Sequence, residues 1–410
     1  MSDASAATVP HRSFSGPFPW LRPDFGEVTA LRGQAPTAPF RTLTVAGEPI
    51  WIITRYAEVR ALLADARLSA DPHRSGFPLL GRFLPPEQPT PFMRTDPPLH
   101  TAFRSVLAGH FTRRAAAAAQ PTIEAIATGL IDELEHVPAG HADLVSDFAV
   151  PLSMQVILGL LGLPTAPWRD VAELATQHMC ASPLTDRDQL RRSLRTGQVL
   201  TGYLDREVRL RESGPAGRDV IDSLLRAAQA GQIPRGSIAT NLFLLVIAGH
   251  DTSAGMLAGT MLRLLGDPHY ADRLRAQPSL IPAAVEESLR QLTIVHQMTL
   301  RASTADIHVG GRTIPAREGV ALMLYSANHD SHRFRDPERF DPDRDTAGHL
   351  AFGHGVHRCI GQSLARAELA VGIRLLLQRF PRLRLRTAIG NDHFKPRSPI
   401  QGLLSLPVQL

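Results

Sequence analysis

The sequence predicts a mainly helical, soluble protein with a few short strands, and three observations favour this fold class. Segments with helical periodicity recur along most of the 410 residues. A hydrophobic content of 43% with 20% charged residues is typical of a globular protein with a sizeable core. No Gly/Ser-rich or Pro-rich linker divides the chain, so we expect an irregular N-terminal extension over residues 1–40 and a single domain over residues 41–410.

The first elements can be placed from local patterns. Alternating apolar residues from Arg41 to Ile53, around Gly47-Glu48-Pro49, predict a two-stranded hairpin. After it we expect helices over residues 56–64, 97–119, 121–136 and 186–212. In the second of these, Asp96 is expected to cap the helix and Pro97 to open it.

The segment from Ser237 to Gly266 predicts a buried central helix, because it has no charge between Arg235 and Asp251. Polar residues such as Asn241 and Thr252 interrupt it too early for a membrane span. A helix over 281–292, short strands within 298–324, a loop-rich segment over 326–358 and a last helix over 360–379 complete the expected order.

Composition excludes several classes of protein. The net charge of +5 is spread without a dense basic run, so nucleic-acid binding is not expected. No signal sequence or membrane anchor is recognisable, and only Cys180 and Cys359 are present, which favours a cytoplasmic protein without disulfides.

The segment from Phe352 to Gly361, F-G-H-G-V-H-R-C-I-G, surrounds Cys359 with glycines and basic residues and contains no acid. A cysteine binds iron as the thiolate, so a loop without carboxylates suits that role. Gly353 and Gly355 allow backbone conformations closed to other residues, and Gly361 leaves room for a flat macrocycle.

This pattern resembles the haem-binding signature of the cytochromes P450, which are haem-thiolate enzymes. The resemblance implies a mainly α fold with a small β-rich lobe. It also implies haem b with Cys359 as the iron ligand and Phe352, His357 and Gly361 beside the haem. The implied co-substrate is O2, with electrons from NAD(P)H through a ferredoxin and a ferredoxin reductase.

Ala248-Gly249-His250-Asp251-Thr252, in the central helix, resembles the oxygen-activation motif of the family. Ala248 and Gly249 would remove bulk where dioxygen must fit. The Thr252 hydroxyl can bond the oxygen or a backbone carbonyl, and Asp251 would relay protons from solvent.

Further positions match the family's haem and core motifs. His100 and Arg104 lie four residues apart on one helix face and, with Arg301 and His357, are expected to bind the haem propionates. A structural Glu-Arg-Arg network is expected from Glu287, Arg290 and Arg344, with Arg339 as the rival for the third position.

One departure from the family concerns a turn. The family often has Pro-Ala-Gly in the strand turn after Arg301, where this chain has Pro315-Ala316-Arg317. A positive φ is therefore not expected at Arg317.

Leu292-Thr293-Ile294-Val295 resembles a stretch common in actinobacterial members that oxidise macrolides and polyketides. The resemblance implies a monomeric monooxygenase of antibiotic or other secondary metabolism that hydroxylates or epoxidises a bulky small molecule. The implied pocket-lining positions, besides the 178–196 region, are Phe92, Met93, Val246, Ile247, Leu292, Thr293, Ile294, Val295, Ile400 and Gln401.

Three alternatives remain open from the sequence. The first is a haem-thiolate enzyme that catalyses oxidative coupling, ring closure or peroxide-driven oxidation. The second is a non-catalytic haem sensor or electron carrier. The third is a zinc protein built from Cys359, His354 and His357, although the chain lacks paired C-x-x-C spacing.

Overall fold

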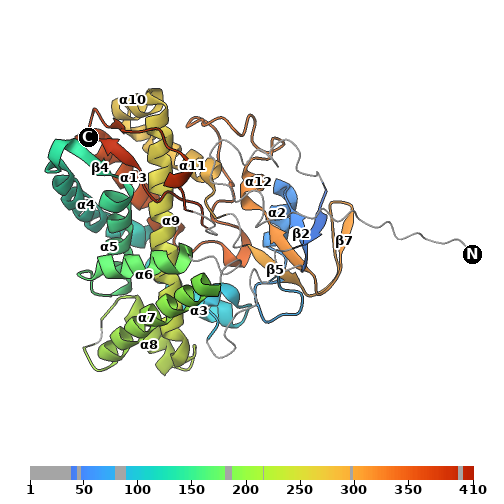
Figure 1. Ribbon diagram of the computed structural model, residues 1–410. Coiled ribbons are helices and arrows are strands. Elements are labelled where there is room, and N and C mark those ends of the chain that lie inside the picture. The colour runs from blue at the N-terminus through green and yellow to red at the C-terminus, as the bar shows by residue number, and fades with distance from the viewer. Residues whose placement is uncertain are drawn as a thin grey trace, which may run out of the picture.

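The computed structural model describes residues 38–43, 48–78, 89–180, 187–215, 217–295, 299–395 and 400–410. The expected N-terminal extension over 1–40 therefore lies almost entirely outside the described residues. Helices dominate the described part, and they gather on one side of the molecule, with a β-rich part on the other (Figure 1). The predicted fold class is confirmed.

The described helices are α2 (Tyr56–Leu63), α3 (Leu99–Ala108), α4 (Arg113–Glu135), α5 (Val150–Leu161), α6 (Trp168–Cys180), α7 (Arg187–Glu212), α8 (Val220–Gln229), α9 (Ile238–Gly266), α10 (Pro268–Ala276), α11 (Ile281–Leu292), α12 (Leu324–Asn328) and α13 (Gln362–Arg379). Short 3-10 turns include η2 (Phe92–Arg94), η3 (Gly109–Phe111) and η8 (Gly355–His357).

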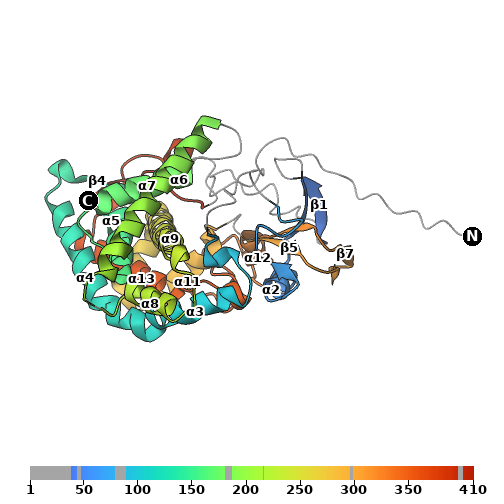
Figure 2. The ribbon, with the colours of Figure 1, turned by 90° about the horizontal axis from the view of Figure 1, so that it is seen from below.

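The strands are β1 (Phe40–Leu43), β2 (Pro49–Ile53), β3 (Leu68–Ser69), β4 (His141–Asp143), β5 (Leu300–Ser303), β6 (Ile307–Val309), β7 (Arg312–Ile314), β8 (Gly319–Leu322), β9 (Arg384–Leu385) and β10 (Pro407–Gln409). The largest sheet has the order β1-β2-β8-β5-β3, in which β1 and β2 form the predicted hairpin. β2 pairs with β8 in parallel and β5 with β8 antiparallel. This sheet and α2 lie together, apart from the helical side (Figure 2).

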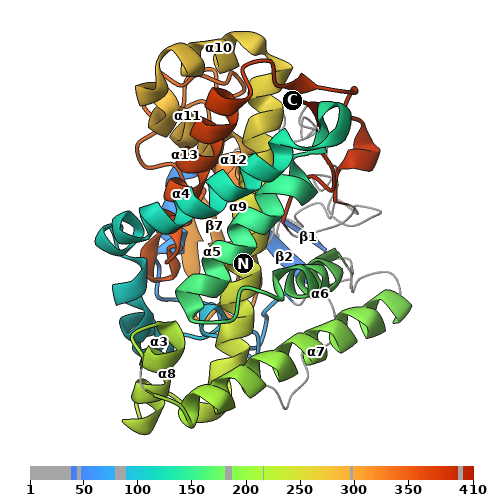
Figure 3. The same ribbon diagram turned by 90° about the vertical axis from the view of Figure 1, so that its left-hand side faces the viewer.

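Helix α9 crosses the height of the molecule and holds the helical side together (Figure 1). It packs against α5, α7, α11 and α13, so its apolar residues face neighbours all round. With the preceding 3-10 turn it is long and apolar enough to cross a membrane, but most of it is buried in the protein. Its composition therefore reflects core packing, as the sequence predicted. Helices α7 and α8 lie together at one end of α9 (Figure 3).

Two predicted helix boundaries are wrong. The expected helix over 97–119 ends at Ala108, and a new helix, α4, begins at Arg113 and runs through Pro121 to Glu135. The Thr112 hydroxyl accepts a hydrogen bond from the Ala115 amide at 3.0 Å and so caps α4. The prediction missed this cap because the alanines that follow Thr112 favour a continuous helix. Pro121 does not end the helix, because its following turns pack along α13. Helices α5, α6, α8 and α10 had no separate prediction.

Asp96 does not cap a helix, contrary to the expectation. Helix α3 begins at Leu99 without a side-chain cap. The Asp96 carboxylate instead accepts from the Ser69 hydroxyl at 2.5 Å and the Ala70 amide at 2.8 Å. Asp96 therefore ties the chain before α3 to β3.

The turn after β7 also differs from the expectation. Arg317 has φ 65°, so the turn keeps the left-handed conformation without glycine. The Arg317 amide donates to the Ser303 carbonyl at 2.8 Å, and the Ser303 hydroxyl donates to the Pro315 carbonyl at 2.6 Å. These bonds offset a conformational cost of about 1–2 kcal/mol.

Candidate active site

Cys359 lies in the loop that precedes α13. The loop folds back because the Cys359 amide donates to the Phe352 carbonyl at 2.8 Å. Gly353 and Gly355 have φ of 66° and 72°, a region that other residues rarely adopt. A Cβ at Gly355 would also lie 2.4 Å from the carbonyl oxygen at the end of α2, whereas at Gly361 it would meet nothing within 4 Å. The chain at Gly361 can thus lie flat against a planar group.

The surroundings of the Cys359 sulfur suit a thiolate that binds a metal cation. Burial raises the pKa of the Cys359 thiol, and the Gly361 amide opposes this rise. Three guanidinium groups oppose it further, and they belong to Arg104, Arg366 and Arg358. A metal ion bound to the sulfur would reverse the balance and hold the anion. In the described part of the chain, no three His, Cys, Asp or Glu side chains form a metal cluster, so the zinc alternative lacks a ligand set.

The predicted propionate-binding residues come together although they lie far apart in the sequence. The rings of His100 and His357 have centroids 4.1 Å apart. Neither ring nitrogen of His100 has a hydrogen-bond partner among the described residues. Burial, reinforced by Arg104, lowers the pKa of His100 to about 4. Burial, reinforced by Arg301, lowers the pKa of His357 to about 3.

Arg94 belongs to the same cluster and was missed in the sequence. Burial lowers the pKa of Arg94 to about 10, and Arg94 in turn helps burial to lower the pKa of Arg301 to about 10. One guanidinium nitrogen, Nη1, is buried and has no partner in the described part of the structure. The signal in the sequence was a basic residue two places before Asp96, next to the predicted pocket residues Phe92 and Met93.

His100, Arg104, Arg301, His357 and Arg94 have no matching set of acids among the described residues. Asp96 is the carboxylate that acts on His100 and Arg301, but its oxygens already accept hydrogen bonds from β3 and the residue after it. Buried cations without partners are costly, so the cluster favours binding of an anionic group. The two propionates of a haem whose iron is bound by Cys359 would supply two negative charges here. The residues therefore fit haem b.

Ala248 is exposed in the middle of α9, although most residues of this helix are buried. The Thr252 hydroxyl donates to the Ala248 carbonyl at 2.5 Å, so it bonds within the helix in this structure. Gly249 also meets a packing requirement. A Cβ there would lie 2.6 Å from Cγ1 of Ile157, so glycine allows α5 to pack closely on α9.

Asp251 is buried and forms an ion pair with Lys395, a residue that the sequence analysis missed. The other carboxylate oxygen, Oδ2, has no hydrogen-bond partner among the described residues. The neighbouring His250 places Nδ1 3.2 Å from the Ser153 hydroxyl, and burial lowers the pKa of His250 to about 4. Asp251 is thus a buried acid with one oxygen held by a cation.

Glu368, on α13, is a second buried acid that was missed. Burial raises the pKa of Glu368 well above its usual range, and the Ser253 side chain opposes the rise by a hydrogen bond. Its Oε2 has no partner in the described structure. In the sequence, one glutamate on an amphipathic helix gave no sign of this burial.

The expected structural network forms with Arg344 rather than Arg339. Arg290 donates to Glu287 through Nε at 2.7 Å and Nη2 at 2.8 Å, and both side chains are fully buried. Arg344 Nε donates to Glu287 at 3.2 Å. Arg339 is exposed and lies 3.7 Å from Asp341. The network connects α11 to the loop before the cysteine.

The predicted pocket positions occupy four segments, which are η2, α9, the residues at the end of α11 and the C-terminal segment. The Phe92 amide donates to the Asn241 side chain at 2.7 Å, which joins η2 to α9. Val295 and Ile400 form a bridge between the residues after α11 and the C-terminal segment. The Thr293 hydroxyl is already bonded to the α11 backbone and to Asn328, at 2.6 and 2.7 Å. Part of the 178–196 region, residues 181–186, lies outside the described residues.

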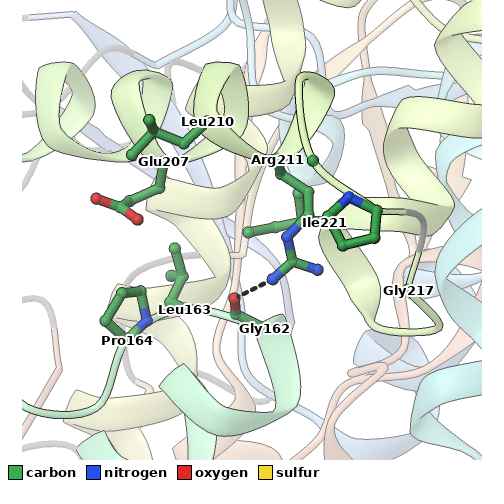
Figure 4. Close-up of a pocket in the computed structure, with 10 residues that line it drawn as sticks. Gly162, Leu163, Pro164, Glu207, Leu210, Arg211, Gly217 and Ile221 are labelled. Carbon is green, nitrogen blue, oxygen red and sulfur yellow. Dashed lines mark hydrogen bonds between the residues drawn. The ribbon is translucent and has the colours of Figure 1, made fainter.

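A cavity of about 680 Å³ lies between the end of α5, helix α7 and the start of α8 (Figure 4). None of the predicted site residues lines it. Its Arg211 donates to the Gly162 carbonyl at 2.9 Å and to Asp219 and Asp222 at 2.6 and 3.0 Å. This arginine is therefore already neutralised, and the cavity reflects the joining of three helices.

The comparisons with known proteins point to a single family. The family model described as cytochrome P450 matches residues 184–385. Cytochrome P450-SU2 of Streptomyces griseolus is 41% identical over 365 residues, which cover 88% of each chain. The 20-oxo-5-O-mycaminosyltylactone 23-monooxygenase of Streptomyces fradiae is 36% identical and covers 93% of this chain and 88% of its own. The crystal structure of mycinamicin VIII C21 methyl hydroxylase MycCI of Micromonospora griseorubida, bound to mycinamicin VIII, superimposes with a TM-score of 0.84 at 34% identity and covers 94% of this chain and 96% of its own.

The fold and the cysteine site define a haem-thiolate protein, and the similarity extends over most of the chain. The protein belongs to the cytochrome P450 family. It is a monooxygenase that uses haem b, O2 and electrons that derive from NAD(P)H through redox partners. When bound, the haem activates O2 so that one oxygen atom enters the substrate and the other leaves as water.

Proposed function

We propose that this enzyme hydroxylates or epoxidises a bulky, weakly polar natural product of the macrolide or polyketide type, as part of secondary metabolism. The observation that carries the proposal is the similarity, over most of the chain, to two hydroxylating enzymes whose names specify such substrates. Among the expected pocket positions, Met93 and Val295 keep part of their apolar surface exposed, as side chains that line a pocket do, whereas Val246 and Ile400 are buried in the core.

The substrate proposal is tested by titrating the purified haem protein with mycinamicin VIII and with myristic acid as a small, flexible comparison. Binding of a fitting substrate in the pocket displaces water from the haem and shifts its Soret band. We expect the macrolide to cause a larger shift at lower concentration than the fatty acid. A shift with the fatty acid alone would contradict the proposal, because the pocket would then suit a chain rather than a ring.

We infer that Asp251 and Thr252 deliver the protons that breaking the O–O bond requires. The support is geometric, since a buried carboxylate and a half-buried hydroxyl occupy adjacent positions in α9, beside the exposed Ala248. Thr252 must leave its bond to the Ala248 carbonyl, or share it, to act on oxygen. Loss of a positioned proton donor typically costs about 10²–10⁴ in rate. Thr252→Ala should therefore form less product per NADH and release more peroxide, whereas full product yield would remove this role.

His100, Arg104, Arg301 and His357 are proposed to bind the two propionates, with Arg94 as a fifth basic group beside them. Their support is the set of depressed pKa values that an anion would relieve. Arg301→Leu should lower the affinity for haem, measured as the rate of haem transfer to apomyoglobin. Haem transfer at the unchanged rate would contradict the assignment.

Electrons are proposed to arrive from a ferredoxin and its reductase, because two cysteines are too few for an iron–sulfur cluster in this chain. We further propose a cytoplasmic monomer in which residues 41–410 act as one catalytic domain. Peroxide-driven oxidation is the second candidate. The buried Asp251 argues against it, because a reaction driven by peroxide needs no relay of protons to bound oxygen. Single-turnover product analysis with dioxygen and surrogate redox partners, compared with peroxide alone, separates the two.

A further inference from the structure

Lys395 is the only lysine in the chain, which uses arginine at every other one of its 44 Lys and Arg positions. It is also buried, with 8% of the residue exposed, whereas lysine is almost never fully buried unless it is paired. Its ammonium group forms the ion pair with Asp251, which is 3% exposed. The single lysine thus lies against the acid that we propose as the proton relay.

The backbone holds Lys395 in place from the C-terminal side. Phe394 pairs with Leu403, and the Lys395 amide donates to the Gly402 carbonyl at 2.9 Å. This segment packs closely on α9, one turn beyond Asp251. The close packing is seen at Gly255, where an added Cβ would lie only 3.3 Å from the Gln401 carbonyl oxygen. Lys395 therefore reaches Asp251 from a segment fixed by backbone contacts.

The chemistry of the pair favours lysine over arginine. An ammonium is a compact charge that can hold one carboxylate oxygen, whereas the planar guanidinium tends to bind both oxygens. In this pair Asp251 Oδ2 has no partner among the described residues, so one oxygen is held and the other remains available. A relay acid needs this combination of fixed orientation and an open proton acceptor.

We propose that Lys395 is a positioning residue for proton delivery, which holds the Asp251 side chain in a fixed orientation through one carboxylate oxygen. This inference rests on the proposed relay role of Asp251. Two other titratable groups lie close by. His250 interacts electrostatically with both members of the pair, and it is neutral near pH 7 because burial lowers its pKa to about 4. Glu368 forms a hydrogen bond with Ser253, two residues along α9, and burial raises the pKa of Glu368 well above its usual range. Lys395 is therefore the cation that Asp251 depends on.

The first test uses the single lysine as a spectroscopic probe. Protein labelled with [ε-¹³C]lysine should give one lysine signal, recorded in the diamagnetic ferrous carbonyl form. A carboxylate beside the ammonium group shifts the signal of the lysine ε-carbon. The signal should therefore move in Asp251→Asn, in which the ammonium loses its anion. Identical spectra of the two proteins would overturn the ion pair and the proposal with it.

The second test measures proton delivery without an organic substrate. Reduction of O2 to peroxide consumes two protons and two electrons, and reduction to water consumes four of each, so the peroxide released per NADH reports whether the O–O bond breaks. Surrogate ferredoxin and reductase supply the electrons. Lys395→Met should raise the peroxide share about threefold or more. Lys395→Arg keeps the positive charge but tends to bind both carboxylate oxygens, so its peroxide share should lie between those of the wild type and Lys395→Met.

The controls separate positioning from folding. Arg386→Met removes an exposed cation from the same C-terminal region and should leave the peroxide share unchanged. In the Asp251→Asn background, Lys395→Met should add nothing, because lysine acts through the aspartate. An equal increase in both backgrounds, or a wild-type share in Lys395→Met, would overturn the proposal. A wild-type share in Asp251→Asn alone would instead refute the relay role on which it rests.

Discussion

Replacing Arg290 by methionine is expected to destabilise the protein far more than removing an exposed arginine. Arg290 is fully buried and donates two bonds to Glu287 and one each to the carbonyls of Asn328 and Pro337, at 2.8 Å. Its loss would leave a buried carboxylate with only Arg344 and a backbone amide as donors. Removal of one partner of such a pair costs about 3–5 kcal/mol.

This free energy can be converted into a melting shift. An unfolding entropy of about 2.1 cal/mol/K per residue gives about 0.9 kcal/mol/K for the chain, so we expect the midpoint to fall by about 3–6 °C. Thermal unfolding of the haem-loaded protein, followed by far-UV circular dichroism, measures it. The matched control is Arg273→Met, because Arg273 binds the exposed Asp343 at 2.7 and 2.8 Å. That pair is exposed to solvent and should contribute little to stability. Equal shifts in the two variants would refute the reasoning.

Two further predictions concern α9. His250 is neutral in the folded protein, with a pKa of about 4 against an ordinary value of 6.5, so its contribution to stability is present above pH 6.5 and is lost as the pH falls toward 4. Between pH 7.5 and 5 this loss amounts to about 2 kcal/mol. Urea unfolding at the two pH values should therefore show a smaller loss of stability on acidification for His250→Asn than for the wild type. An equal loss in the two proteins would contradict the assignment. Gly249→Ala should destabilise the protein because its Cβ would lie 2.6 Å from Ile157, and Ile157→Ala should restore part of the stability. Urea unfolding of the single and double variants measures this. A loss of stability in Gly249→Ala that Ile157→Ala does not relieve would contradict the packing requirement.

Features encoded in contiguous segments could be predicted from the sequence. The Cys359 loop, the apolar run of α9 and the β1–β2 hairpin depend on local patterns, because glycine positions, charge-free stretches and alternation act within a few residues. Helix boundaries were less certain. The hydroxyl of Thr112 caps α4, and packing on α13 carries the helix through Pro121, which local propensity alone does not predict.

Contacts between distant segments were decided only by the tertiary structure. Nothing in the neighbouring sequence showed that Lys395 would pair with Asp251 or that Glu368 would be buried beside Ser253. Nor did it show that Arg94 would lie with the basic residues proposed to bind the propionates. The cost of burying a charge depends on which groups surround it in space, and 144 residues separate Lys395 from its partner. The sequence by itself therefore predicted the iron ligand and the oxygen-activation motif, whereas the folded chain decided which charges surround them.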